Sequence, residues 1–122
     1  MIVRSNTGYR KFGRVPGYEH QVGISVLFHA PETTGLPSAE ENAALTAIED
    51  VICPALEEEA ASLLVAVITT SGMREFVFYT RAPQEVRQRF EQFRNRIAGH
   101  QIQLMVQSDK KWAVYAQLTQ NS

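Results

Sequence analysis

The segment LLVAVITTSGMREFVFYTR, Leu63 to Arg81, decides the fold that we expect for this chain. Its first part, Leu63 to Thr70, is a continuous run of apolar and β-branched residues, and its second part, Met73 to Thr80, is rich in aromatic residues. Ser71-Gly72 lies between the two parts, and glycine supplies the positive φ that a tight turn requires. The segment therefore predicts a β-hairpin, with one helical pattern before it and one after it.

Upstream of the hairpin, the sequence predicts one strand and one helix. In Tyr18 to Ala30, apolar residues alternate with small and polar ones, and a period of two is typical of a strand with one buried face. Ser38 to Ala61 has apolar residues at helical spacing, and Ser38 with Glu41 forms a capping pair at its start. Pro54 lies inside this helix, so it must kink the helix or end its first segment near Cys53.

Downstream of the hairpin, a second helix, a strand and a short helix are expected. Pro83 suits the first helical turn, and Gly99 is expected to follow the last residue of that helix. The apolar residues of the helix recur at spacings of four, three and four residues: Val86, Phe90, Phe93 and Ile97. The alternation in Gln101 to Gln107 predicts the last strand. Asp109 is then expected to cap a short helix whose apolar face consists of Trp112, Tyr115 and Leu118.

The order strand, helix, strand, strand, helix, strand is that of the split βαβ, or ferredoxin-like, α+β fold. We therefore expect a four-stranded antiparallel sheet with two helices on one face, because crossover connections are right-handed, together with the short C-terminal helix. Residues 1–17 contain basic residues and no acidic residue. They are expected to form a basic arm, with a short edge strand at residues 2–4 as an alternative, and residues 18–122 are expected to form one α+β domain.

Composition limits the functions that we expect. The 122 residues suffice for one domain with a hydrophobic core, and 44% hydrophobic and 20% charged residues are ordinary globular values. A net charge of −1 gives no field that attracts nucleic acid or an anionic membrane, so neither is an expected partner. No apolar run is long enough to span a membrane. The single cysteine, Cys53, excludes an internal disulfide and favours a reducing compartment, so we expect a cytoplasmic location.

Charge is divided along the chain. Val15 to Met73 contains nine acidic residues and no lysine or arginine, whereas Arg74 to Lys111 contains eight basic and four acidic residues. The two long helices therefore carry opposite charge. We expect their side chains to pair weakly at the surface, with an acidic face for a basic partner as the alternative.

The sequence contains no pattern that predicts a catalytic or metal site. The three histidines, His20, His29 and His100, lack the spacing of metal ligands, and we expect no metal or other cofactor. Cys53 is expected to be a buried structural thiol. Hydroxyls at the predicted hairpin turn, beside Arg74, are candidates to cradle a small anion.

The strand patterns also predict which side chains leave the helix-covered face of the sheet. Successive side chains of a strand point to opposite faces of the sheet. If Phe76 and Phe78 lie under the helices, their neighbours on the hairpin therefore lie on the other face. The apolar residues expected there are Leu27, Val77, Tyr79 and Met105. An exposed apolar sheet face favours an interface, so we expect it to pair with a second copy of the chain, or to be covered by the helix that contains Trp112 and Tyr115.

These features favour a non-enzymatic protein-binding or regulatory module, whose partner is another protein or a second copy of the chain. The alternative is a small enzyme or anion-binding domain with its site at residues 69–74. In that alternative, Arg74 supplies the charge, and Tyr79 and Glu49 are the candidate proton-handling groups.

Several segments together resemble a bacterial family described as domain of unknown function 695. In order, they are Gly35-Leu36-Pro37, Ile48-Glu49-Asp50, Thr69 to Thr80 (TTSGMREFVFYT), and Asp109, Trp112 and Tyr115. This resemblance covers about two thirds of the chain and implies no catalytic residue. The chain is also similar in outline to a more distant bacterial group, the regulator B of ribonuclease E activity, which is ferredoxin-like and acts by binding.

Overall fold

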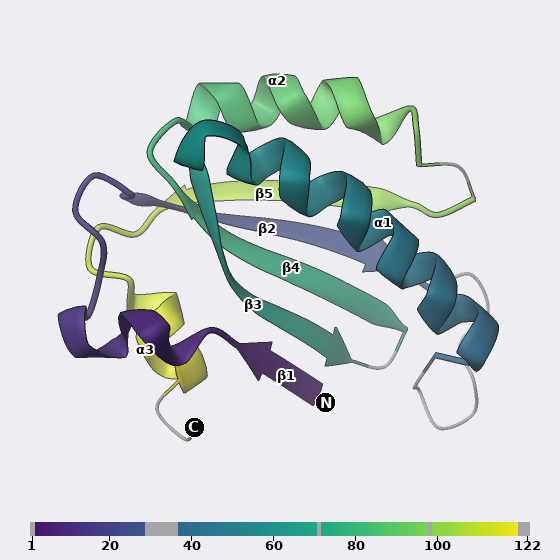
Figure 1. Ribbon diagram of the computed structural model, residues 1–122, viewed down its shortest axis with the longest axis horizontal. Helices are drawn as coiled ribbons and strands as arrows, with labels where there is room; N and C mark the ends of the chain where they lie inside the picture. Colours follow the sequence, from purple (N-terminus) through teal and green to yellow (C-terminus); the bar gives the residue numbers. More distant parts are fainter. Residues whose placement is uncertain (1, 29–36, 71, 98, 120–122) are drawn as a thin grey trace.

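The computed structural model describes residues 2–28, 37–70, 72–97 and 99–119, which form three α-helices and one five-stranded antiparallel sheet (Figure 1). The strands are β1 Ile2–Ser5, β2 His20–Leu27, β3 Ser62–Thr70, β4 Met73–Thr80 and β5 Ile102–Ser108. The helices are α1 Ala39–Glu57, α2 Pro83–Arg94 and α3 Ala113–Thr119. The predicted α+β class is confirmed.

The sheet differs from the prediction in the number of its strands. Its order is β1-β3-β4-β2-β5, so β1 adds a fifth strand beside β3, at the edge opposite β5. The expected four-stranded sheet is therefore wrong in this detail. The physical reason is that the basic N-terminal segment does not only drape over the domain: Ile2 pairs with Thr69, and Ser5 pairs with Ala66.

The β3–β4 hairpin begins at Ser62, one residue before the predicted start, and its turn lies where the sequence predicts it. Thr70 pairs with Met73, and Gly72 between them has a φ of +84°, which glycine adopts without a Cβ clash. Ser71 lies outside the described residues. The hairpin thus places two long central strands next to each other.

A β-bulge interrupts the alternation of β3 between Leu64 and Ala66, where Val65 is the extra residue. Leu64 and Val67 belong to the core under α1 and α2, whereas Val65 and Ala66 both belong to the cluster on the opposite face. The bulge therefore adds one more apolar side chain to that opposite face than a regular strand would.

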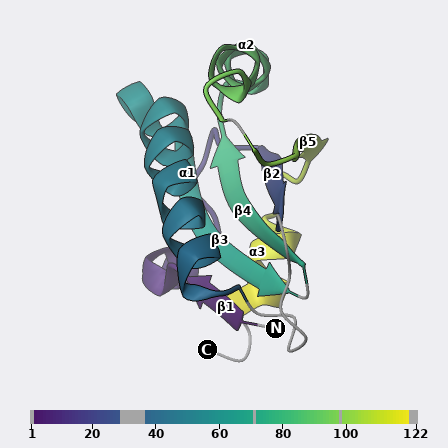
Figure 2. The same ribbon diagram turned by 90° about the vertical axis from the view of Figure 1, so that its right-hand side faces the viewer.

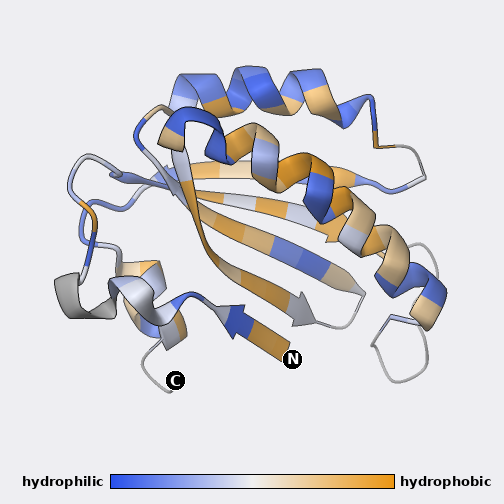
Figure 3. Cartoon of the chain, viewed as in Figure 1, coloured by the Kyte–Doolittle hydropathy of each residue, from blue (hydrophilic) through white to orange (hydrophobic). Residues whose placement is uncertain are grey.

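Helices α1 and α2 lie on one face of the sheet (Figures 1 and 2). Hydrophobic residues follow the strands and the side of α1 that faces them, whereas α2 is largely hydrophilic away from the sheet (Figure 3). The largest side chains of this core are fully or almost fully buried: Ile24, Leu45, Ile52, Leu56, Phe76, Phe78, Phe90 and Phe93. The predicted inward-facing residues of the strands and helices are confirmed.

The ends of the two long helices differ from the prediction. Helix α1 ends at Glu57 and not at Ala61, because Glu59 and Ala60 adopt positive φ angles. Of the two outcomes expected at Pro54, an end near Cys53 does not occur, since exposed Pro54 removes only one backbone donor while Leu56 beyond it is buried in the core. Helix α2 ends at Arg94, before Gly99. Its chain continues in tighter turns, in which the N–H of Ile97 donates to the carbonyl of Arg94, so Ile97 still reaches the core.

The expected surface pairing between the two helices takes another form. Among the described residues, no ion pair joins α1 to α2. Instead, Nη1 of Arg89 donates to the carbonyl oxygens of Ala55, at 3.1 Å, and of Glu58, at 3.3 Å, while its Nη2 pairs with Glu85 on its own helix. The positive charge of Arg89 also stabilises the C-terminal end of α1, because that end carries the negative pole of the helix dipole.

Candidate functional site

The face of the sheet opposite α1 and α2 is partly covered by α3 and by the 3₁₀ helix Thr7–Phe12. Trp112, which precedes α3, is fully buried and stacks on Tyr79, with ring centroids 4.1 Å apart and an interplanar angle of 12°. Its Nε1 donates to the carbonyl oxygen of Tyr18 at 2.7 Å. Tyr115 packs edge-on against Trp112, and its hydroxyl donates to the carbonyl oxygen of Asn6 at 2.6 Å. These contacts form a second hydrophobic core.

Asp109 joins this second core to the start of α3. Its Oδ1 accepts from the N–H of Ala113 at 2.9 Å, and its Oδ2 accepts from the N–H of Val114 and, at 2.7 Å, from the hydroxyl of Tyr79. The predicted capping role is thus confirmed. Burial works to raise the pKa of Asp109, but the hydrogen bonds from Tyr79 and the two backbone groups outweigh it and lower this pKa. Burial and the bond to Asp109 raise the pKa of Tyr79, so its hydroxyl stays a donor.

The residues expected on the open sheet face fall into two groups. Val77, Tyr79, Trp112 and Tyr115 are all buried together in the second core, so they are not accessible to a partner while α3 is in place. Of the two expected arrangements, the structure has the one in which the Trp112 segment covers the face. Leu27 is half-buried and Met105 is 40% exposed, and both lie outside that core.

The cavity beside Arg74 lies between α1 and the edge formed by β1 and β3. It has a volume of about 260 Å³ and is lined by Ile2, Arg4, Asn42, Thr46, Glu49, Val67, Thr69 and Arg74. Nε of Arg74 donates to Oγ1 of Thr69 at 3.0 Å, and its Nη2 donates to Oδ1 of Asn42 at 3.0 Å. Arg4 enters from β1 and pairs with Glu49 at 2.8 Å. The arginine expected at the hairpin tip thus points under α1.

The structure does not bring together the three residues of the alternative enzyme hypothesis, Arg74, Tyr79 and Glu49. Arg74 and Glu49 line the cavity on the helix-covered side of the sheet. Tyr79 is an odd number of residues from Arg74 on the same strand, and its ring is buried with Trp112 on the opposite side. The sheet therefore separates the two candidate proton-handling groups, Tyr79 and Glu49, and leaves only the anion-binding part of that alternative.

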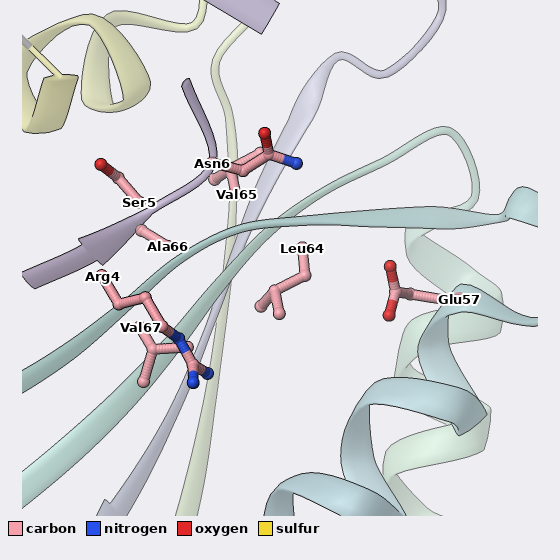
Figure 4. Close-up of a pocket in the computed structure, with 8 residues that line it drawn as sticks. All are labelled: Arg4, Ser5, Asn6, Glu57, Leu64, Val65, Ala66 and Val67. Atoms are coloured by element: carbon pink, nitrogen blue, oxygen red, sulfur yellow. The ribbon is translucent and has the colours of Figure 1, made fainter. Parts of the chain in front are cut away.

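A second cavity lies farther along the same groove, between β1, β3 and the C-terminal part of α1 (Figure 4). Its volume is about 330 Å³, and it shares Arg4 and Val67 with the first. Figure 4 shows Glu57 on α1 across the groove from Leu64 on β3. Arg4 therefore contributes to both cavities.

The opposite edge of the sheet also borders a cavity. Strand β5 pairs with β2 in an unbroken register from Ile102 opposite Val26 to Ser108 opposite His20. A cavity of about 450 Å³ lies between β5 and α2, and it is lined by Arg87, Phe90, Glu91, Arg94, Ile102, Gln103 and Leu104. An exposed strand edge next to a cavity of this kind can accept an added strand from a partner.

Sequence reasoning missed one close contact. His100 Nε2 lies 2.5 Å from Oε1 of Glu41, and both side chains are less than a tenth exposed. The two residues are far apart in sequence, and Glu41 was expected only to complete the helix cap. The expected cap is present, because the backbone N–H of Glu41 donates to Oγ of Ser38 at 3.1 Å. No local pattern could have identified the contact with His100.

Other residue types give no further site among the described residues. Cys53 is buried, as expected, and burial raises the pKa of its thiol to about 12, so the nucleophilic thiolate is scarce at neutral pH. Within the described part of the chain, no histidine, cysteine and carboxylate side chains form a group of three or more that could hold a metal ion. In the same part, every helix is too short or too polar to cross a membrane.

Comparison with known proteins identifies the family of the chain. Residues 1–119 match the model of the Family of unknown function (DUF695), so the chain belongs to that family. This confirms the resemblance that the sequence motifs indicate. The more distant similarity to regulator B of ribonuclease E activity is not part of this finding and stays a prediction. A search of curated proteins gave no match.

Proposed function

We propose that this DUF695 member is a non-enzymatic binding domain whose exposed edge strand β5 pairs with a strand of a protein partner, and that the partner is a second copy of the chain. The observation that carries the proposal is the chemistry of β5, with the sequence IQLMVQS. Its seven residues include no charge and no proline, and its pairing with β2 has no bulge.

Natural proteins protect an edge strand by making it short, or by adding charge, proline or a bulge. The other edge of this sheet follows that rule, since β1 has four residues and includes the largely exposed Arg4. Strand β5 has none of these protections. An unprotected edge is a template for backbone hydrogen bonds with another chain, which supports pairing at β5.

The surroundings of β5 supply side-chain contacts for a partner strand. The half-buried residues Ile102 and Leu104, together with Phe90, line the cavity beside α2. Alternate side chains of an added strand would point into this cavity, and the others would lie beside Met105. Apolar contact of this kind adds to the backbone hydrogen bonds.

A second copy is favoured over another protein by charge. In an antiparallel pair with twofold symmetry, equivalent residues of the two copies lie on either side of the axis, so a charged strand would oppose like charges. Strand β5 is neutral and avoids this cost. With the axis at Met105, Leu104 of one copy lies beside Val106 of the other, and Gln103 lies beside Gln107. Apolar residues then meet apolar residues, and amides meet amides.

Light scattering coupled to size-exclusion chromatography tests the proposal. Wild-type protein should elute with twice the chain mass of 13.7 kDa at high concentration and dissociate on dilution. The double variant Gln103→Lys and Gln107→Lys places like charges across the axis and should be monomeric with an unchanged circular dichroism spectrum. The matched control, Gln84→Lys and Gln88→Lys, makes the same charge change at exposed positions on α2 and should remain dimeric.

Two results would overturn the proposal. One is a wild-type protein that stays monomeric at every concentration. The other is a dimer that both lysine pairs weaken equally, because the effect would then come from net charge and not from the edge of β5.

A second candidate function, anion binding beside Arg74, is favoured by one specific observation. Among the described residues, the guanidinium of Arg74 has no carboxylate within ion-pair distance, although its side chain is less than half exposed. Arg74 and Tyr79 cannot form one catalytic site, because Tyr79 lies on the other side of the sheet.

We also propose that the fold is a ferredoxin-like split βαβ unit with an added edge strand. What supports this assignment is the order β3-β4-β2-β5 within the sheet, in which each neighbouring pair is antiparallel. The fold leaves β5 at an edge, and this position makes the strand available for pairing.

A further inference from the structure

We infer that the cavity between α1 and the edge formed by β1 and β3 binds a small monoanionic carboxylate, with Arg74 and Arg4 as the recognition groups. The inference rests on the second candidate function and names the ligand class. It is independent of pairing at β5, which lies at the opposite edge of the sheet.

Arg74 is the centre of the site because its charge is only partly satisfied. Its two hydrogen bonds go to the neutral oxygens of Thr69 and Asn42, which fix the plane of the guanidinium without neutralising it. Burial lowers the pKa of Arg74, and the opposing effect of the nearby Glu49 charge does not offset this lowering. A guanidinium held in this way is preorganised for a carboxylate, whose two oxygens match its fork of donors.

The charge of the cavity selects a monoanion. Its lining includes the cations Arg4 and Arg74 and the single carboxylate Glu49, so one positive charge is left over. Glu49 is already paired with Arg4, at 2.8 Å. One carboxylate completes the balance, whereas a phosphate dianion would leave an excess negative charge beside Glu49.

The remaining lining residues define the rest of the ligand. Asn42, Thr46 and Thr69 supply amide and hydroxyl groups, and Ile2 and Val67 supply apolar surface. A volume of about 260 Å³ accommodates a ligand of a few heavy atoms. The geometry therefore fits a short aliphatic carboxylate, with its charged end at Arg74 and its chain beside Val67.

Nuclear magnetic resonance titrations of the full chain test this inference with three probes. Butyrate is the expected ligand class, butyramide is its neutral isostere, and inorganic phosphate is the anion that should bind less well. Butyrate should shift the signals of Asn42, Thr69 and Arg74 saturably, with a dissociation constant of roughly 1 mM, as expected for a ligand of few atoms. Butyramide should produce no saturable shift at these residues.

Charge variants separate ligand recognition from a purely structural role for Arg74. Glu49→Gln leaves both arginines unneutralised, so it should tighten butyrate binding by roughly threefold to tenfold and allow phosphate to bind. Arg74→Gln should weaken butyrate binding by roughly tenfold or more. The control Arg94→Gln makes the same charge change on α2 and should leave binding unchanged.

If Arg74→Gln is poorly folded, Arg4→Gln provides the same test, because the Arg4 side chain is 63% exposed and its removal leaves the cavity without net charge. The inference is wrong if butyrate and butyramide shift the same signals equally. It is also wrong if Glu49→Gln fails to tighten butyrate binding. In that case Arg74 would serve only to join α1 to the sheet through its hydrogen bonds to Asn42 and Thr69. Neither result bears on the mass of the wild-type assembly, so the proposed pairing at β5 stands or falls separately.

Discussion

Replacing Trp112 by alanine should be among the most destabilising single substitutions in this chain. Trp112 is fully buried, and removal of a buried tryptophan costs about 3–5 kcal/mol. The stacked ring of Tyr79 adds about 0.5–1.5 kcal/mol, and the Nε1 bond to Tyr18 adds about 1 kcal/mol. The φ of +57° at this position is not relieved, because alanine also has a Cβ.

We therefore expect a loss of about 5 kcal/mol, which is a large part of the 5–15 kcal/mol that stabilises a typical domain. Urea denaturation followed by far-ultraviolet circular dichroism measures it, since the variant lacks the only tryptophan. Trp112→Phe keeps a stacked ring and should lose much less. Gln88→Ala, at an exposed position on α2, is the control and should change stability by at most about 0.5 kcal/mol.

The reasoning is refuted if Trp112→Ala loses no more than about 0.5 kcal/mol, the range of an ordinary surface change. It is also refuted if the fluorescence of Trp112 in the native wild type resembles that of a solvent-exposed indole. Either result would mean that α3 does not cover the sheet in solution.

Three further predictions follow from the packing and titration of single residues. Phe90→Ala should cost about 3–5 kcal/mol in the free energy of unfolding, because Phe90 is 5% exposed in the core, and a loss near zero would mean that the register of α2 is wrong. The lowered pKa of Asp109 means that its stabilising effect is present above the ordinary aspartate pKa and is lost as pH falls through the depressed value. Wild-type stability should therefore decline below about pH 4 more steeply than that of Asp109→Asn, and parallel pH profiles would contradict this. Cys53, with its pKa raised to about 12, should react with a thiol reagent at neutral pH only after unfolding, so rapid labelling of the native protein would show that the thiol is accessible.

The sequence was sufficient to predict the hairpin and the inward-facing side chains, because both depend on local signals. Gly72 marks the turn, and alternation on β2, β4 and β5 determines which residues share a face. The spacing of Val86, Phe90 and Phe93 likewise identifies the buried side of α2. Errors occurred where a regular pattern ends. The bulge at Val65 cannot be recognised in a run of apolar residues, and the last turns before Ile97 tighten without a change in hydrophobic spacing.

The candidate sites were less predictable, because they depend on contacts between distant segments. Parity on the hairpin indicates that Val77 and Tyr79 leave the main core, but the sequence left open whether a second copy or the Trp112 helix covers them. The cover is Trp112, which packs on Tyr79 from a separate element. Arg74 was singled out from the sequence as an anion-binding candidate. Its neighbour Arg4 reaches the same cavity only because β1 joins the sheet, and the sequence offered that edge strand only as an alternative to a basic arm.

Amide hydrogen exchange, measured at several protein concentrations, tests the proposed pairing of β5 most directly. If two copies pair at this edge, the amides of Ile102–Ser108 that point away from β2 become more protected as concentration rises, while the amides of Ile2–Ser5 at the other edge do not. The double variant Gln103→Lys and Gln107→Lys should abolish this concentration-dependent protection. Exchange of the β5 amides that is independent of concentration, over a range in which the protein is otherwise folded, would contradict the account.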